Sequence, residues 1–78
     1  MKTKFKIGQR VFSTIFGYGI ITIIEPYDER PIIVKFGSKS YDFYPDGTWY
    51  ENDKHPSLFH SVKEASEYFT KIAEREKK

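Results

Sequence analysis

Residues 16–25 read Phe-Gly-Tyr-Gly-Ile-Ile-Thr-Ile-Ile-Glu, with four isoleucines in the six positions after the second glycine. Side chains branched at Cβ have few rotamers and favour extended backbone, so we predict a strand over 19–25 that is buried on parts of both faces. Two glycines around one aromatic ring allow positive φ on either side of it. Residues 16–19 therefore predict a tight turn, with Tyr18 at its tip.

Glycine and proline divide the rest of the first part of the chain into pieces of about five to seven residues, a spacing typical of short strands. The predicted turns are 26–31, 37–40 and 45–47, and the predicted strands are 10–15, 19–25, 31–36, 41–44 and 48–50. Five short antiparallel strands joined by tight turns suit a small, strongly bent and partly open barrel. We expect Phe16 and Phe36 in its core, and Phe59 with Leu58 closing its base.

The last segment changes from strand to helix periodicity. Ser61-Val-Lys-Glu64 fits a capping box, in which Ser61 caps the helix and Glu64 reaches back from the third helical position. Apolar residues then recur at helical spacing along one stripe: Val62, Ala65, Phe69, Ile72 and Ala73. The pattern predicts a helix over about 61–76 that covers one open end of the barrel.

Length and composition indicate a single small domain. The chain has 78 residues, with a barrel predicted at about 5–50, a connecting loop at about 51–60 and the helix after it. It has no cysteine, which excludes disulfides and thiolate metal clusters, and its 18% aromatic content argues against disorder. No apolar run approaches the roughly 20 residues that cross a bilayer, and the basic N-terminus lacks a signal-peptide hydrophobic region. We therefore expect a cytoplasmic protein without a membrane partner.

The formal charge of +2 is distributed unevenly. Residues 1–10 carry four basic side chains and no acidic one, for +4. Residues 11–60 carry four basic and seven acidic side chains, for −3, and residues 61–78 carry five basic and four acidic, for +1. A basic stripe across the folded body is typical of nucleic-acid binders, so the acidic body opposes extended duplex contact. The basic N-terminal arm leaves contact with phosphate open.

Candidate catalytic and metal-binding residues cluster at 53–60, where Asp53, His55, Ser57 and His60 lie close in sequence. A catalytic triad depends on geometry held in a rigid pocket, for which a chain this small has little room. The five-residue step between the histidines suits neither a helical i,i+4 pair nor a zinc-finger spacing. We predict that the protein is not an enzyme, holds no metal and uses no cofactor.

One resemblance rests on Ile7-Gly-Gln-Arg-Val11, Phe16-Gly-Tyr-Gly19 and Ile32-Ile-Val-Lys-Phe36. This pattern resembles the SH3-like or Tudor-like barrels found at the C-terminus of some DNA-repair helicases and in CarD-type transcription factors. Gln9 stands where those domains have Asp. The resemblance implies an SH3-like fold and, because those domains mainly dock on RNA polymerase, a protein partner.

A second resemblance extends over nearly the whole chain. Gly17-Tyr-Gly19, Tyr44-Pro-Asp-Gly-Thr-Trp-Tyr50 and His55-Pro-Ser-Leu-Phe-His60 follow one another as in short phage and Bacteroides-type proteins. That family carries no settled activity to transfer. Its resemblance implies a mobile-element origin and a role in modulating host machinery, including defence against phage.

The aromatic residues of the turns and late strands are the candidate binding residues, because exposed Tyr and Trp give large contact area at small entropic cost. We predict a binding surface with cationic residues at its rim: Tyr18, Tyr27, Tyr41, Trp49 and Tyr50, with Lys35 or Arg30. The alternative for Tyr44 and Trp49 is that they close the barrel under the helix. The sequence thus predicts a non-catalytic module that docks on a host protein. Nucleic-acid binding by the same rings and the basic arm, or sequestration of a nucleotide-like ligand, stay open.

Overall fold

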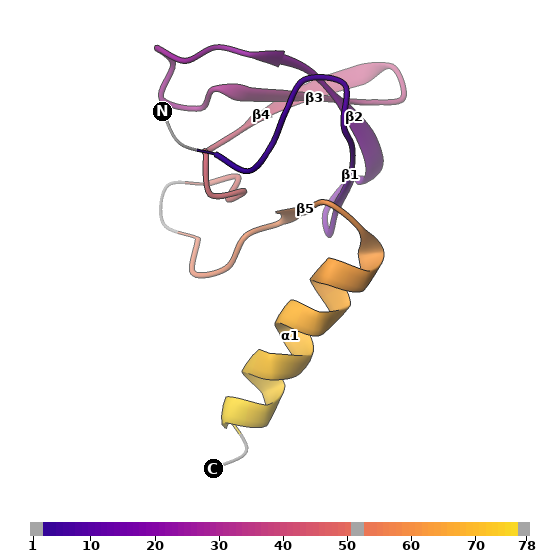
Figure 1. Ribbon diagram of the computed structural model, residues 1–78, viewed down its shortest axis with the longest axis vertical. Helices are drawn as coiled ribbons and strands as arrows, with labels where there is room; N and C mark the ends of the chain where they lie inside the picture. The colour runs from indigo at the N-terminus through magenta and orange to yellow at the C-terminus, as the bar shows by residue number, and fades with distance from the viewer. Residues whose placement is uncertain (1–2, 51–52, 77–78) are drawn as a thin grey trace.

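The computed structural model describes residues 3–50 and 53–76. Its five strands are β1 (Arg10–Ser13), β2 (Gly17–Ile24), β3 (Ile32–Phe36), β4 (Lys39–Phe43) and β5 (Leu58–Phe59), followed by helix α1 (Val62–Glu76). The strands pair antiparallel in the order β4-β3-β2-β1-β5. They form a curled half-barrel from which α1 projects (Figure 1). The predicted class, a mainly β bent sheet with one C-terminal helix, is confirmed.

The inner face of the curled sheet carries the core. Its members have almost no exposed surface: Phe5, Val11, Ile21, Ile32, Val34, Phe43 and Leu58. Fully burying one such side chain contributes about 1.5–3 kcal/mol, so this cluster is the main stabilising feature of the fold. The partly buried Phe16 and Phe36 pack against it, as the sequence predicts. Between Ile21 and Ile23 the β2–β3 register shifts, which marks a β-bulge at Thr22.

The predicted turn at 16–19 is wrong. The turn occupies residues 14–16, and β2 already begins at Gly17. The hydroxyl of Ser13 fixes this position, because its Oγ accepts hydrogen bonds from the backbone N–H groups of Ile15 and Phe16, both at 3.1 Å. Tyr18 consequently lies within β2, opposite Phe12 of β1, and not at a turn tip.

The predicted strand at 48–50 is also wrong, and the fifth strand is β5, which pairs with β1. Side-chain hydrogen bonds hold residues 48–50 in a local loop. Asp46 Oδ1 accepts from the backbone N–H of Thr48 at 3.0 Å, and Asp53 Oδ2 accepts from those of Trp49 and Tyr50 at 3.3 and 3.0 Å. Such bonds offer the backbone an alternative to a strand ladder. The predicted loop residues 51–52 lie outside the described residues.

Helix α1 begins with the predicted Ser61 cap, because Ser61 Oγ accepts a hydrogen bond from the backbone N–H of Glu64 at 3.1 Å. The other half of the predicted capping box is wrong, because the Glu64 carboxylate contacts Lys4 and His60 instead of reaching back to the cap. Its later turns project away from the sheet (Figure 1), so α1 does not cover an open end of the barrel as expected. It is attached through rings, since Phe59 of β5 lies 5.6 Å from Tyr68 and 5.8 Å from Phe69 between centroids. Phe59 therefore packs on the helix, while Leu58 faces the core. Within the described ranges, no helix is long and apolar enough to span a membrane.

Candidate functional site

The face of the sheet opposite the core is only partly covered. Strand residues alternate between faces, so the neighbours of the buried Val11, Gly19 and Ile21 point outward. The register places Arg10 opposite Ile20 and Ile20 opposite Lys35. We call the outward-pointing side chains of β1, β2 and β3 the outer face: Arg10, Phe12, Tyr18, Ile20, Ile23, Ile33 and Lys35.

Three large apolar side chains of the outer face stand well out of the protein. Tyr18 is 57% exposed, Ile20 51% and Ile23 44%. Single exposed hydrophobic residues are normal on a protein surface, whereas a contiguous group marks an interaction site. Ile23 is also paired with Ile33 across β2 and β3, which extends the group onto the neighbouring strand. Their backbone positions are fixed by the pairing of β2 with β1 and β3.

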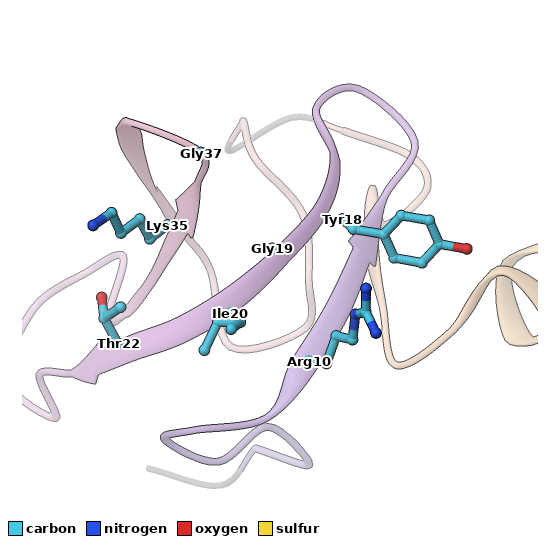
Figure 2. Close-up of a pocket in the computed structure, with 7 residues that line it drawn as sticks. All are labelled: Arg10, Tyr18, Gly19, Ile20, Thr22, Lys35 and Gly37. Atoms are coloured by element: carbon cyan, nitrogen blue, oxygen red, sulfur yellow. The ribbon is translucent and has the colours of Figure 1, made fainter.

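Tyr18 and Arg10 form a ridge across the outer face. The guanidinium carbon of Arg10 lies 5.3 Å from the centroid of the Tyr18 ring, within the range of a cation–π contact. Phe12 meets the same ring edge-on, with a centroid distance of 5.2 Å. These two contacts orient the exposed ring before any partner arrives. Figure 2 shows Arg10 and Tyr18 side by side, with Ile20 on the adjoining surface of β2.

A hollow lies on each side of this ridge. The first, which we call the sheet hollow, has a volume of about 480 Å³ and is lined by Arg10, Tyr18, Gly19, Ile20, Thr22, Lys35 and Gly37 (Figure 2). The second, the helix hollow, has a volume of about 520 Å³ and is lined by Arg10, Tyr18, His60, Ser61, Val62 and Lys63. Arg10 and Tyr18 belong to both hollows, so one ligand could span them. No carboxylate is among the described residues that line either hollow.

The predicted binding residues do not form one surface. Of the seven, Tyr18 and Lys35 line the hollows. Tyr41 and Trp49 pack around Phe16 instead: Tyr41 is stacked on it at 4.1 Å between centroids, and Trp49 meets it edge-on at 4.9 Å. Both are half-buried against the core. The packing of Trp49 agrees with the alternative interpretation that it closes the barrel, although α1 does not lie over it.

The other three predicted residues lie outside both hollows. Tyr27 is fully exposed in the loop between β2 and β3, and Tyr50 is exposed beside Trp49, 4.5 Å away between centroids. Arg30 Nη2 donates to the backbone carbonyl of Asp42 at 3.1 Å and lies 3.3 Å from its carboxylate. Arg30 thus links the loop between β2 and β3 to strand β4.

The border of the helix hollow is fixed by a polar cluster that we call the Lys4 clasp, formed by Lys4, His60 and Glu64. Lys4 Nζ lies 2.8 Å from Glu64 Oε1, while the His60 ring lies 3.2 Å from Glu64 Oε2 and 3.1 Å from the carbonyl oxygen of Lys4. The hydrogen bond from Lys4, and after it the one from His60, holds the pKa of Glu64 below its ordinary value, although partial burial opposes this. The clasp joins the N-terminal segment to the first turn of α1.

Of the residues that the sequence suggests for catalysis or metal binding, Asp53, His55 and His60 have side-chain partners, whereas Ser57 has none among the described residues. The His55 Nδ1 lies 3.1 Å from the Tyr68 hydroxyl, and Asp53 caps the loop at 49–50. The buried Ser57 Oγ has no hydrogen-bond partner in the described part of the chain. Across residues 3–50 and 53–76, no group of three or more His, Cys, Asp or Glu side chains is arranged to hold a metal ion.

Sequence reasoning missed Arg10, Ile20, His60 and Lys63 as residues of the site. The alternation of buried and exposed positions along 10–13 and 18–22 could have placed the first two on one face with Tyr18. No local signal points to Lys63, because its position depends on how α1 attaches to β5.

No protein-family model, curated protein or solved structure matches the chain.

Proposed function

We propose that the protein is a non-catalytic binding module that docks on another protein through its outer face. The observation that carries this proposal is the contiguous exposure of Tyr18, Ile20 and Ile23 on a strand-backed surface. Covering the exposed half of one isoleucine is worth about 1 kcal/mol, from the roughly 1.5–3 kcal/mol of full burial. The resemblance to phage and Bacteroides-type proteins supports a host protein, of the transcription or defence machinery, as the partner.

A protein partner fits this face better than a nucleic acid. Proteins that bind single strands stack successive bases on several rings. Among the described residues, Tyr18 is the one ring that lines the sheet hollow, and the second ring of the helix hollow, that of His60, is held by Glu64 and the carbonyl oxygen of Lys4. Isoleucine gives contact area to another apolar surface and no stacking platform. In addition, Lys4 of the basic N-terminal arm is already paired with Glu64, which reduces the charge that the arm offers to phosphate.

Recovery of a partner by the tagged protein from a nuclease-treated bacterial lysate tests the proposal. The double variant Tyr18→Ala with Ile20→Lys should no longer recover a stoichiometric protein partner. It should stay folded, because both side chains point away from the core. Tyr27→Ala is the matched control, since it removes a ring of the same type that is still more exposed and lies outside both hollows. Circular dichroism and melting temperature establish that the variants are folded.

Two results would contradict protein docking at the outer face. Recovery that disappears on nuclease treatment would assign the surface to nucleic acid. Recovery that survives the double substitution and is lost in Tyr27→Ala would move the interface to the loop between β2 and β3.

A further inference from the structure

The cations beside the outer face are not neutralised within the described part of the chain. Arg10 belongs to both hollows, Lys35 lines the sheet hollow and Lys63 lines the helix hollow, and none of the three forms an ion pair with another described residue. Two acids close to these strands and to the start of α1 are already paired: Glu64 with Lys4 and Asp42 with Arg30. The described residues therefore present exposed apolar side chains that are bordered by unpaired positive charges.

From this arrangement we propose that the outer face binds an acidic segment of the partner protein, in which an apolar side chain is flanked by carboxylates. This inference rests on the proposed docking function and specifies its partner. The apolar side chain covers Tyr18 and Ile20. Carboxylates on one side reach Lys35 and Arg10 across the sheet hollow, and those on the other side reach Lys63 in the helix hollow.

Arg10 is suited to hold a carboxylate at the centre of such an interface. Its guanidinium is oriented by the Tyr18 ring, so less side-chain freedom is lost when it binds. Guanidinium and carboxylate have matching two-pronged geometry and form hydrogen bonds about twice as strong as neutral ones. Because Arg10 lines both hollows, its carboxylate partner would lie where the apolar and ionic contacts meet.

A protein segment is favoured over a single-stranded nucleic acid because it supplies both kinds of contact. Ile20 and Val62 line the two hollows and call for apolar side chains. A sugar–phosphate chain would satisfy the cations, but among the described lining residues only Tyr18 offers an exposed ring to a base, because the His60 ring packs against Phe5 and is bonded to Glu64. Complementary charge at an interface mainly speeds association and excludes wrong partners, so binding should weaken with added salt while a salt-resistant apolar part persists.

Selection from a library of random peptides displayed on phage tests the proposal, followed by anisotropy titrations of the enriched peptides. We expect the enriched peptides to share an apolar residue flanked by Asp or Glu. Reversing charge with Arg10→Glu and Lys63→Glu together should weaken their binding at least about tenfold. Lys54→Glu with Lys71→Glu, which changes the net charge equally outside both hollows, should change it less than about twofold. Peptides with Lys in place of the acids should regain affinity for the Arg10/Lys63 variant.

The outcomes separate this inference from the docking function itself. Two outcomes would overturn the acidic segment while supporting docking at the outer face. In the first, the peptides fail to bind the Tyr18→Ala variant but show no preference for acidic residues. In the second, they bind the Arg10/Lys63 variant as tightly as the Lys54/Lys71 control. Peptides unaffected by Tyr18→Ala, or a library that yields no binder, would count against both. Oligothymidine that binds the wild type more tightly than any peptide, and is lost in the Arg10/Lys63 variant, would overturn the inference in favour of nucleic acid.

Discussion

Gly19 is the position where the structure predicts the clearest cost of adding one methyl group. A Cβ atom at Gly19 would lie 2.7 Å from two carbons of the Phe36 ring and 2.8 Å from the carbonyl oxygen of Lys35. The ring cannot turn aside freely, because it packs 5.2 Å from Phe16 and 6.1 Å from Phe43 between centroids. The carbonyl belongs to the neighbouring strand β3, so relief would require the two strands to separate.

The expected magnitude for Gly19→Ala follows from two opposing effects. Overpacking in a well-filled site costs about 1–3 kcal/mol. Replacing a glycine by alanine lowers the conformational entropy of the unfolded chain, which stabilises the fold by about 0.4–1 kcal/mol where the native φ suits alanine. Gly19 meets this condition, because it is not among the glycines with positive φ. We therefore expect a net loss of about 1–2 kcal/mol in the free energy of unfolding. For a domain of this size that lowers the melting temperature by about 5–15 °C.

Thermal denaturation followed by circular dichroism measures this loss, and a double-mutant cycle with Phe36→Leu assigns its cause. Shortening Phe36 removes the ring contacts but leaves the Lys35 carbonyl, so Gly19→Ala should cost less in that background without becoming neutral. Gly17→Ala is the control: it has open space around it but a φ of 88°, and its strain of about 1–2 kcal/mol should be the same in both backgrounds. A wild-type melting temperature for Gly19→Ala, or an equal cost in both backgrounds, would refute the close approach of β2 to Phe36.

Three other changes test the attachment of α1, the Lys4 clasp and the distinction between core and surface tyrosines. Phe69→Asp should cost about 2 kcal/mol and make α1 sensitive to limited proteolysis, because it breaks the contact with Phe59; unchanged stability would contradict the ring-mediated attachment. The pKa of Glu64 is lower in the folded protein than its ordinary value of 4.5, so the ionised carboxylate stabilises the fold at pH values above 4.5. This contribution is lost as the pH falls through the lower pKa of the folded state. Urea titrations should show the loss in wild type and not in Glu64→Gln, at a size of about 0.5 kcal/mol because the pair is partly exposed. Tyr41→Ala should cost about 3 kcal/mol through its stacked ring, whereas Tyr27→Ala should leave the melting temperature unchanged.

The fold was predictable where local pattern and tertiary packing agree. The isoleucine run of β2 and the Ser61 cap of α1 are such places, and both elements form as predicted. The predicted burial of β2 on parts of both faces is wrong, because Ile20 and Ile23 are exposed on its outward side. It was not predictable where one side-chain hydrogen bond decides the backbone. The Ser13 hydroxyl sets the turn at 14–16, and Asp46 and Asp53 keep residues 48–50 out of the sheet. A serine or aspartate gives no sequence signal of which N–H group it will meet.

The candidate site was predictable in part for a similar reason. The two flanking glycines indicate Tyr18 as a binding residue, and it is exposed on β2, although it lies in a strand and not in the predicted turn. The ring count alone could not separate Tyr18 from Tyr41, since both are tyrosines in β-rich segments. Only the register shows that Tyr41 lies opposite Val34 on the buried face. Lys63 depends on a contact between distant segments, which no pattern in one segment reveals.

The direction of α1 explains why the outer face is left open. Phe12 and Phe59 are cross-strand partners, so they lie on the same face of the sheet, and the rings of Tyr68 and Phe69 cover that face at β5. The helix then leaves the sheet instead of crossing β1 and β2 (Figure 1).

The two hollows consequently rest on different supports. The sheet hollow is formed within β1, β2, β3 and the turn after β3, so its shape depends on the strand ladder. The helix hollow exists only while the first turn of α1 stays beside Tyr18, and this depends on the Lys4 clasp and the Phe59 contacts. Because the clasp has modest energy and exposed partners, the helix hollow should open at lower cost than the sheet hollow. A partner that uses both hollows would therefore stabilise the attachment of α1 as it binds.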